Sequence, residues 1–138
     1  MGIKQLSIFL ENNLGKLADV TAVLAKAQVN IKALSIADTA DFGILRIVAD
    51  DIGKAEAALS GAHWTYREGE VLAVEVENFP GSLAGAMKVF QNAHVNIEYV
   101  YSALEWHAGK AVLLFKLGEP QKGLAALKEH GITVLETI

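Results

Sequence analysis

The sequence contains no cysteine, only two prolines, and no apolar stretch near the roughly 18 residues of a membrane-spanning helix. The absence of cysteine excludes disulfides, thiolate nucleophiles and cysteine-ligated zinc or iron–sulfur sites. Positive charge is also scarce, because 12 Lys and Arg stand against 16 Asp and Glu, which gives a net charge of −4. Nucleic-acid-binding domains usually show the opposite balance. We therefore expect a cytoplasmic protein with neither nucleic-acid nor membrane partners.

The composition is that of a folded protein. Hydrophobic residues make up 52% of the 138 positions and charged residues 20%. This is more apolar and less charged than an average soluble domain, which argues against disorder. The length suits one domain of common size or two very small ones.

The chain is an internal duplication. Leu6–Ala18 aligns with Leu72–Ala84, 66 residues later, and the alignment resumes where Ala27–Ile31 meets Ala93–Ile97. The matches include polar residues and glycine, which chance similarity of two amphipathic stretches does not explain. Gly61 aligns with Gly131, so the second copy holds about four extra residues, expected in a hairpin near 107–110. Two copies predict a pseudo-twofold pair with boundaries 1–68 and 69–138.

Each copy shows the pattern strand, helix, strand, strand, helix, strand. Alternation of apolar and polar residues predicts the strands. Apolar residues at helical spacing predict the first helix of each copy, which begins after Gly15 or Gly81. The second helices begin near Asp50 and Pro120. This order is that of the α+β, ferredoxin-like βαββαβ unit, an antiparallel sheet with helices on one face. We expect the open face to hold Phe9, Arg46, Glu75, Leu34, Ile36, Val100 and Leu104. So much apolar surface favours a second sheet packed there, hence a homodimer.

The segment Arg67–Glu70 joins the copies without a proline- or serine-rich linker. A short glycine-containing segment between two extended runs favours an antiparallel hairpin. In that case the last strand of the first copy would pair with the first strand of the second. The prediction is that the copies exchange these strands.

The two strand-to-helix turns, Glu11–Leu17 and Glu77–Leu83, are the candidate chemical sites. Glycine lets a ligand approach the backbone, and the start of the following helix attracts a carboxylate. An asparagine supplies both an acceptor and a donor, as an α-amino acid requires. A second asparagine begins the next strand in the sequence Val-Asn-Ile, at Asn30 and at Asn96. Asn and Gly are also common in turns that bind nothing, and duplication of the set favours the functional interpretation.

Asn78-x-Pro80-Gly81-x-Leu83, followed by Val-Asn-Ile, resembles the ACT domain, a small regulatory module of amino-acid metabolism. The resemblance covers both copies, with no catalytic domain, although Leu14 replaces the proline in the first. It implies that the loop of one copy binds an amino acid against the second strand of the other. The implied residues are Asn12, Leu14 and Gly15 with Asn96 and Ile97, and Asn78, Pro80, Gly81 and Ser82 with Asn30 and Ile31.

The sequence gives little support for metal binding or catalysis. The four histidines, His63, His94, His107 and His130, do not show metal-ligand spacing, and no nucleophile–base pair or phosphate loop is present. We therefore expect no metal, no cofactor and no enzymatic activity. The favoured function is an amino-acid sensor, with an apolar amino acid preferred, that regulates an enzyme of amino-acid metabolism. The alternatives are an interaction module that docks on such an enzyme without a ligand, and a small enzyme.

Overall fold

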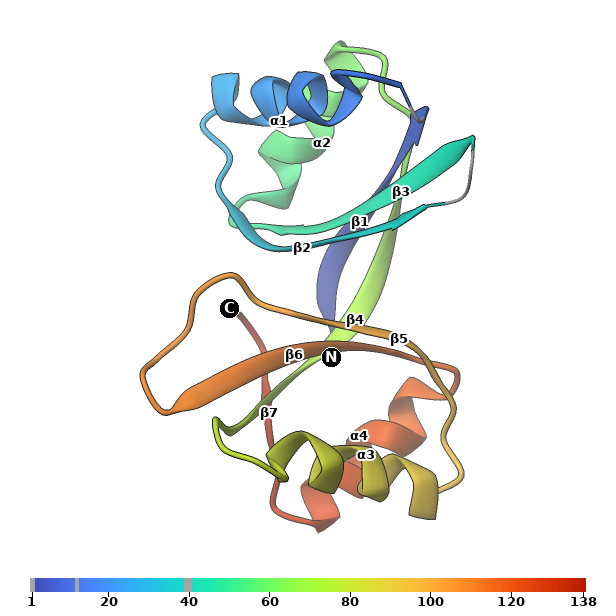
Figure 1. The fold of residues 1–138 in the computed structure, drawn as a ribbon, viewed down its shortest axis with the longest axis vertical. Coiled ribbons are helices and arrows are strands. Elements are labelled where there is room, and N and C mark those ends of the chain that lie inside the picture. Colours follow the sequence, from blue (N-terminus) through green and yellow to red (C-terminus); the bar gives the residue numbers. More distant parts are fainter. Residues whose placement is uncertain (1, 12, 39–40) are drawn as a thin grey trace. The chain divides into compact units, whose positions relative to one another are not determined.

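The computed structural model describes residues 2–11, 13–38 and 41–138. The elements are β1 (Ile3–Glu11), α1 (Lys16–Lys26), β2 (Ile31–Asp38), β3 (Phe42–Ala49), α2 (Ile52–Gly61), β4 (Tyr66–Glu77), α3 (Ser82–Asn92), β5 (Ile97–Ser102), β6 (Lys110–Leu117), α4 (Pro120–Glu129) and β7 (Thr133–Leu135) (Figure 1). The βαββαβ order occurs twice, and β4 ends the first occurrence and begins the second. The predicted α+β fold with two ferredoxin-like repeats is confirmed.

Contacts within the chain divide it into two compact units. One is Lys4–Gly69, here called the first repeat, and the other is Glu70–Ile138 together with the first residues of the chain, here called the second repeat. The strand order is β2-β3-β1-β4 in the first repeat and β5-β6-β4-β7 in the second. The pairs β1–β3, β2–β3, β4–β6, β4–β7 and β5–β6 are antiparallel.

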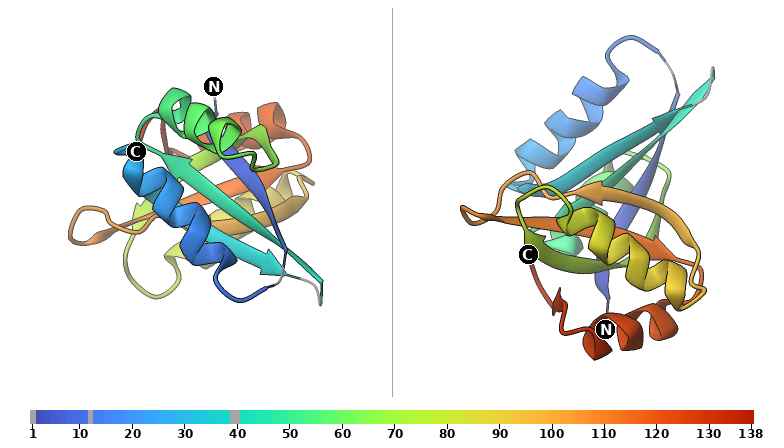
Figure 2. Two further views of the ribbon diagram at one scale, coloured as in Figure 1. Left: turned by 90° about the horizontal axis from the view of Figure 1, so that it is seen from above. Right: turned by 60° about the horizontal axis from the view of Figure 1, so that its bottom comes forward.

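Each repeat has its own core between one sheet face and two helices. In the first repeat, Ile8 of β1 packs with Leu24 of α1 and Leu59 of α2. In the second, Phe90 of α3 packs with Phe115 of β6 at a ring-centroid distance of 5.0 Å. Figure 2 shows α1 beside α2 and α3 beside α4, each pair over its own sheet. The apolar helix positions anticipated from the sequence thus face the sheet.

The predicted open face needs a correction at three positions. Leu34 lies opposite Ile47 and Ile36 opposite Leu45, so both occupy the helix-covered face, at the edge strand β2. Val100 lies opposite Phe115 on the helix-covered face of the second sheet. The reason is a register shift between Ile31 and Ala33, repeated between Ile97 and Tyr99. One extra residue in a strand turns every later side chain to the other face.

Of the other four residues predicted for the open face, three lie on it and one lies in a loop. Arg46 lies opposite Ser7 and Phe9 opposite Ile44, out of register with the core positions Leu6 and Ile8, so both belong to the open face. Glu75 lies opposite Val112, also away from the core positions of its sheet. Leu104 lies beyond β5, in the loop that leads to β6, and is exposed.

The predicted hairpin between the copies is wrong. Residues 66–77 form one continuous strand, and Gly69 is not among the glycines with positive φ. A Cβ built on Gly69 would lie 4.0 Å from Nε2 of buried Gln5, an ordinary van der Waals distance, so the strand needs no turn at this position. The predicted strand exchange is also wrong for the described residues. Each last strand pairs within its own repeat, as the Phe9 N–H bond to the Thr65 carbonyl and the Ala73–Leu135 pair show.

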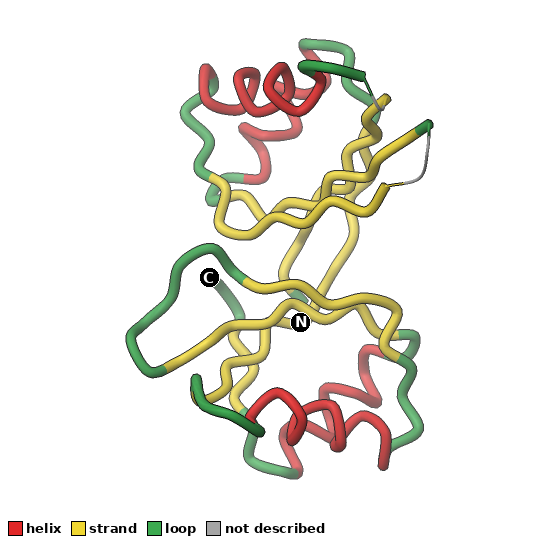
Figure 3. The backbone as a smooth tube through the Cα atoms, in the orientation of Figure 1, coloured by secondary structure: helices red, strands yellow, loops and turns green. Residues whose placement is uncertain are grey.

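The extra residues of the second repeat lie where the sequence predicts them. The connection from β5 to β6 spans residues 103–109, whereas β2 and β3 are separated by residues 39–41 only. The longer connection is the wide green loop in Figure 3. We call it the β5–β6 loop.

We predict opposite effects of alanine at two helical glycines. A Cβ at Gly123 would lie 2.4 Å from Cδ1 of Leu117, a side chain held in the second core. Such overpacking costs about 1–3 kcal/mol, so Gly123→Ala should lower the free energy of unfolding. Gly53 is the control, because its Cβ would meet only Asp51, at 3.5 Å. Gly53→Ala should leave stability unchanged or raise it by up to about 1 kcal/mol. Urea unfolding of both variants measures the difference, and equal stabilities would contradict the assigned packing.

Candidate functional site

The strand-to-helix turn of the first repeat places a left-handed glycine at the start of α1. Gly15 has φ 86° and is the N-cap residue, and its carbonyl accepts the Asp19 N–H at 2.8 Å. Glycine has no side chain to cap the helix, and the Lys16 N–H donates to the Asn13 carbonyl at 3.3 Å, so an anion could approach only the N–H groups that follow Lys16 in the first turn. Leu14 is fully exposed. Asn12 lies outside the described residues, so its predicted role stays a prediction.

A pocket of about 150 Å³ lies beside this turn. It is formed by the end of β1, the start of α1, the end of β2 and the start of β3, and its lining residues are Leu10, Glu11, Asn13, Lys16, Leu17, Ile36 and Gly43. A cavity of this volume holds a molecule about the size of benzene. Part of the lining is apolar, and part carries charge of both signs. The pocket therefore offers different surfaces to the two ends of a small ligand.

The charged groups of this pocket come from β1 and α1. Nδ2 of Asn13 donates to Oε2 of Glu11 at 3.0 Å, which orients the carboxylate. Lys16 is the first residue of α1 and is half-buried. Among the described residues, neither Glu11 nor Lys16 takes part in an ion pair. Lys16 thus brings a positive charge to the pocket, whereas Glu11 alternates with Leu10 along β1 and lies opposite Phe42, in the register of the open face.

The equivalent turn of the second repeat has the same backbone. Gly81 has φ 97° and is the N-cap residue of α3, and the Asn78 N–H donates to the Gly109 carbonyl at 3.0 Å. Pro80 is exposed. Oγ of Ser82 is shielded from solvent and has no hydrogen-bond partner in the part of the chain that the structure describes. Four predicted site residues thus form one turn.

The second asparagines lie at the far end of each sheet from these turns. Asn30 precedes β2 and is fixed by its backbone, since its N–H donates to Oδ1 of Asp50 at 2.9 Å. The Asn96 carbonyl likewise accepts the Gly118 N–H at 3.0 Å. Because β1 and β2 are both antiparallel to β3, they run in the same direction. The start of β2 therefore lies at the other end of the sheet from the end of β1. Among the described residues, neither repeat brings its own turn and its own second asparagine together, and the predicted pairing with the other repeat stays a prediction. Ile31 and Ile97 pack against the cores.

Sequence reasoning missed most of the residues that line the first-repeat pocket. Glu11, Asn13 and Lys16 lie within the candidate turn Glu11–Leu17, but the sequence predicts no role for them, and Ile36 and Gly43 lie outside that turn. A signal existed for Lys16, which directly follows the glycine of the turn. None existed for Ile36 or Gly43, because the β-bulge in β2 and the β1–β3 register bring them to the pocket.

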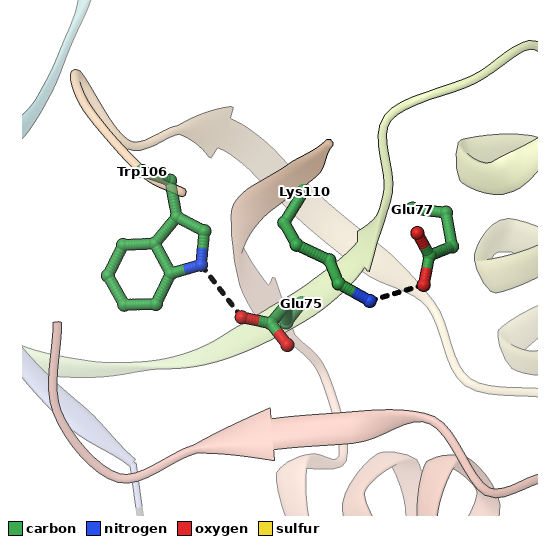
Figure 4. Close-up of polar contacts among 4 residues, drawn as sticks. All are labelled: Glu75, Glu77, Trp106 and Lys110. Atoms are coloured by element: carbon green, nitrogen blue, oxygen red, sulfur yellow. Dashed lines mark hydrogen bonds and ion pairs between the residues drawn. The ribbon is translucent and has the colours of Figure 1, made fainter. Parts of the chain in front are cut away.

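A cluster of polar side chains fixes the β5–β6 loop to the second sheet (Figure 4). Nε1 of Trp106 donates to Oε2 of Glu75 at 2.7 Å. Nζ of Lys110 pairs with Oε1 of Glu77. The hydrogen bond and charge of Glu77 raise the pKa of Lys110, and the charge of Glu75 adds to this effect. Both carboxylates at the end of β4 are thus engaged by groups from the loop and the start of β6.

The second repeat holds another pocket of about 150 Å³, in a different place. It lies among the middle of β4, the end of β6 and the start of α4, and its lining includes Gly2, Leu72, Lys116, Gln121 and Leu124. No sequence motif pointed to this place. Within the described ranges, no three His, Asp or Glu side chains come together as a metal site would require. No helix in the described ranges is long and apolar enough to cross a membrane.

Comparison with known proteins finds one family model and several solved structures that resemble the chain. A family model described as "ACT domain pair" matches residues 1–136. The crystal structure of protein BT0572 from Bacteroides thetaiotaomicron is 40% identical, with a TM-score of 0.91, covering 98% of this chain and 92% of that one. The ligand-free regulatory subunit of aspartate kinase from Thermus thermophilus shares the fold, with a TM-score of 0.71 at 13% identity over 95% of this chain and 92% of that one.

Aspartate kinase from Synechocystis also shares the fold, with a TM-score of 0.64 at 18% identity. The match covers 98% of this chain and 26% of that one. No curated protein matches the chain in sequence. The similarity thus spans the whole chain and both repeats.

We predict that alanine is tolerated at Gly85 and not at Gly81, although both lie near the start of α3. Gly81 has φ 97°, a conformation that costs an L-residue about 1 kcal/mol or more, so Gly81→Ala should destabilise the protein. Gly85 is helical and a Cβ there meets nothing within 4 Å. Gly85→Ala should therefore stabilise by up to about 1 kcal/mol. Thermal unfolding checks both, and a stable Gly81→Ala variant would rule out the left-handed turn.

Proposed function

The chain belongs to the ACT domain pair family, and from this premise we propose that it is a non-catalytic regulatory protein that binds a free amino acid. The observation that carries the proposal is the first-repeat pocket. It combines the ammonium group of Lys16 and the start of α1 with apolar walls. An α-amino acid presents a carboxylate and a side chain within a few bonds, and for an apolar amino acid these two groups match the pocket in chemistry.

The apolar walls favour an apolar amino acid. Leu10, Leu17 and Ile36 line the pocket together with the charged groups. Burial of an aliphatic side chain against such walls contributes about 25 cal/mol per Å² of apolar surface removed from water. A charged ligand side chain would lose hydration there without a further partner of opposite charge.

Regulation requires that the ligand bind one state of the protein more tightly than another. We propose that the bound amino acid changes how the protein associates with an enzyme of amino-acid metabolism. The printed name of the Thermus thermophilus neighbour describes a regulatory subunit of aspartate kinase. That protein shares the fold, which supports a regulatory function in the present case without identifying the enzyme.

We predict that one or more of the twenty proteinogenic amino acids raises the melting temperature of the full chain. A ligand at 100 times its dissociation constant adds about 2.7 kcal/mol to the free energy of unfolding. If each turn also meets the second strand of the other repeat, Asn30→Ala and Asn96→Ala should reduce the shift. Asn92→Ala is the matched control, an exposed asparagine at the end of α3 that lies outside every proposed site.

The twenty-compound measurement also separates the two main functional alternatives. A protein that only docks on an enzyme would show no thermal shift with any amino acid. That result would overturn the sensor function and favour the interaction module. A shift that survives in both asparagine variants would retain the sensor and remove these asparagines from its site.

We further propose that the protein forms homodimers, because large apolar side chains lie exposed in the first repeat. Among them are Leu34 (37% exposed) and Ile36 (43%) on the edge strand β2, and Phe42 (58%) on β3. Sedimentation equilibrium at micromolar concentration should give twice the mass of one chain. Ile36→Asp should shift the protein toward monomer, whereas Lys32→Asp on the same strand should have a smaller effect. A monomeric wild-type protein would contradict the proposal.

A further inference from the structure

Two side chains, one from the β5–β6 loop and one from the start of β6, hold the last residues of β4. Nε1 of Trp106 donates to Oε2 of Glu75 at 2.7 Å, and Nζ of Lys110 pairs with Oε1 of Glu77 (Figure 4). Glu75 and Glu77 are two residues apart on one strand, so both carboxylates lie on the same face of the sheet. Lys110 lies directly opposite Glu77 in the β4–β6 register. The loop is thus attached where β4 passes into the second strand-to-helix turn.

The backbone of the loop continues this attachment into the turn. The Asn78 N–H, one residue beyond β4, donates to the Gly109 carbonyl at 3.0 Å. Gly109 has φ 79°, in the left-handed region, and the Lys110 N–H donates to the His107 carbonyl at 3.1 Å. Asn78 is the first of the four predicted site residues of this turn, and Ser82 is the last. The loop therefore fixes the backbone at the first residue of the candidate site.

The hydrogen bond from Trp106 is the stronger of the two side-chain contacts. Its acceptor is a carboxylate and the bond is partly buried, and a charged acceptor strengthens a hydrogen bond. The side chains of the Lys110–Glu77 ion pair are 39% and 51% exposed, so water and salt weaken their attraction. The hydrogen bond and charge of Glu77 raise the pKa of Lys110, which stays charged at neutral pH. Loss of the indole N–H should loosen the loop more than loss of the lysine charge.

The first repeat carries different residues at the equivalent positions. Phe9 stands where the second repeat has Glu75. Phe42 stands where it has Lys110, opposite the glutamate that ends the preceding strand. A phenyl ring neither forms an ion pair nor accepts an indole N–H as a carboxylate does. These two side-chain contacts therefore belong to the second repeat.

We propose that the β5–β6 loop fixes the second strand-to-helix turn in the conformation that binds an amino acid, and that Trp106 and Lys110 are the positioning residues. Neither residue is among the predicted ligand contacts, and both act through β4. A turn that is fixed before the ligand arrives loses less conformational entropy on binding. This inference rests on the proposed amino-acid-binding function for its effect on the ligand, whereas the attachment of the loop is testable without any ligand.

Amide hydrogen exchange in the full chain, measured residue by residue by NMR, tests the attachment. The reporters are the hydrogen-bonded N–H groups of Asn78, Ser82 and Gly85. Trp106→Phe should speed their exchange about tenfold or more, because the hydrogen bond that it removes has a charged acceptor. Lys110→Gln should speed it about twofold to fivefold, as expected for an exposed ion pair.

Other amides of the same chain are the internal controls. The N–H groups of Lys16 and Asp19 make the first-repeat equivalents of the Ser82 and Gly85 hydrogen bonds, and they should exchange at the wild-type rate in each variant. The Ile132 N–H is hydrogen-bonded at the end of α4 and reports any general loosening of the second repeat. Its exchange should also stay at the wild-type rate.

Further variants separate the contacts from other effects of substitution. Glu75→Ala should speed exchange as Trp106→Phe does, and the double variant should add little, because both substitutions remove the same hydrogen bond. Lys110→Arg keeps the positive charge and should exchange as the wild type does. Glu105→Gln is the matched control, because it removes an exposed charge from the same loop and should have no effect.

Titration with L-leucine, followed in NMR spectra of the same protein, tests the effect on the ligand. Shifts of the Ser82 amide report binding at the second turn, and shifts of the Lys16 amide report binding at the first. Trp106→Phe should raise the apparent Kd at the second turn about threefold to tenfold, because only molecules with a formed turn bind. The first turn should keep its wild-type value.

The two measurements distinguish failure of this inference from failure of the proposed function. Unchanged exchange at Asn78 and Ser82 in Trp106→Phe, or an equal acceleration at Ile132, would overturn the attachment. Faster exchange with an unchanged Kd at the second turn, or no L-leucine shift there, would overturn the positioning role. If none of the twenty amino acids gave a thermal shift, the proposed function and the positioning role would both be wrong, and faster exchange would still support the attachment.

Discussion

The backbone hydrogen bonds along β4 are the constraint on which both repeats depend. This strand closes the sheet of the first repeat beside β1 and is an inner strand of the second, between β6 and β7. An extended backbone leaves N–H and C=O groups on both sides that must find partners when buried. Residues 66–77 form one continuous strand with neighbours on both sides, although the boundary between the two repeats lies inside this segment. Neither sheet is complete without its part of β4.

The duplicated turns show how one backbone can carry two chemistries. Gly15 and Gly81 adopt the same left-handed conformation and begin helices of the same length. What differs is the charge of the neighbours, since the partner of Glu11 is Phe42 and that of Glu77 is Lys110. Coulomb attraction between opposed side chains is strongest where water is partly excluded. The same glutamate is therefore ion-paired in the second repeat and lies opposite an aromatic residue in the first.

Local patterns anticipated the elements well because their causes are local. Proline at the start of α4 and the buried positions Val20 and Leu24 of α1 follow from rules that act within one turn of helix. The prediction failed where a distant neighbour decided the outcome. Gly69 resembled a turn residue, and the strand continues through it beside Gln5. Leu34 and Val100 were assigned to the wrong face because one bulge residue after each Val-Asn-Ile motif inverts the alternation that follows.

By itself, the sequence determined the duplication, the order of elements, the glycine turns and the family resemblance, because each is written in residues close together along the chain or repeated at one offset. Only the tertiary structure decided which side chains share the first-repeat pocket. Leu10, Lys16 and Ile36 come from three elements, and the strand register and a bulge bring them to one place. Register depends on the packing of whole sheets against helices, and no short segment of sequence specifies it.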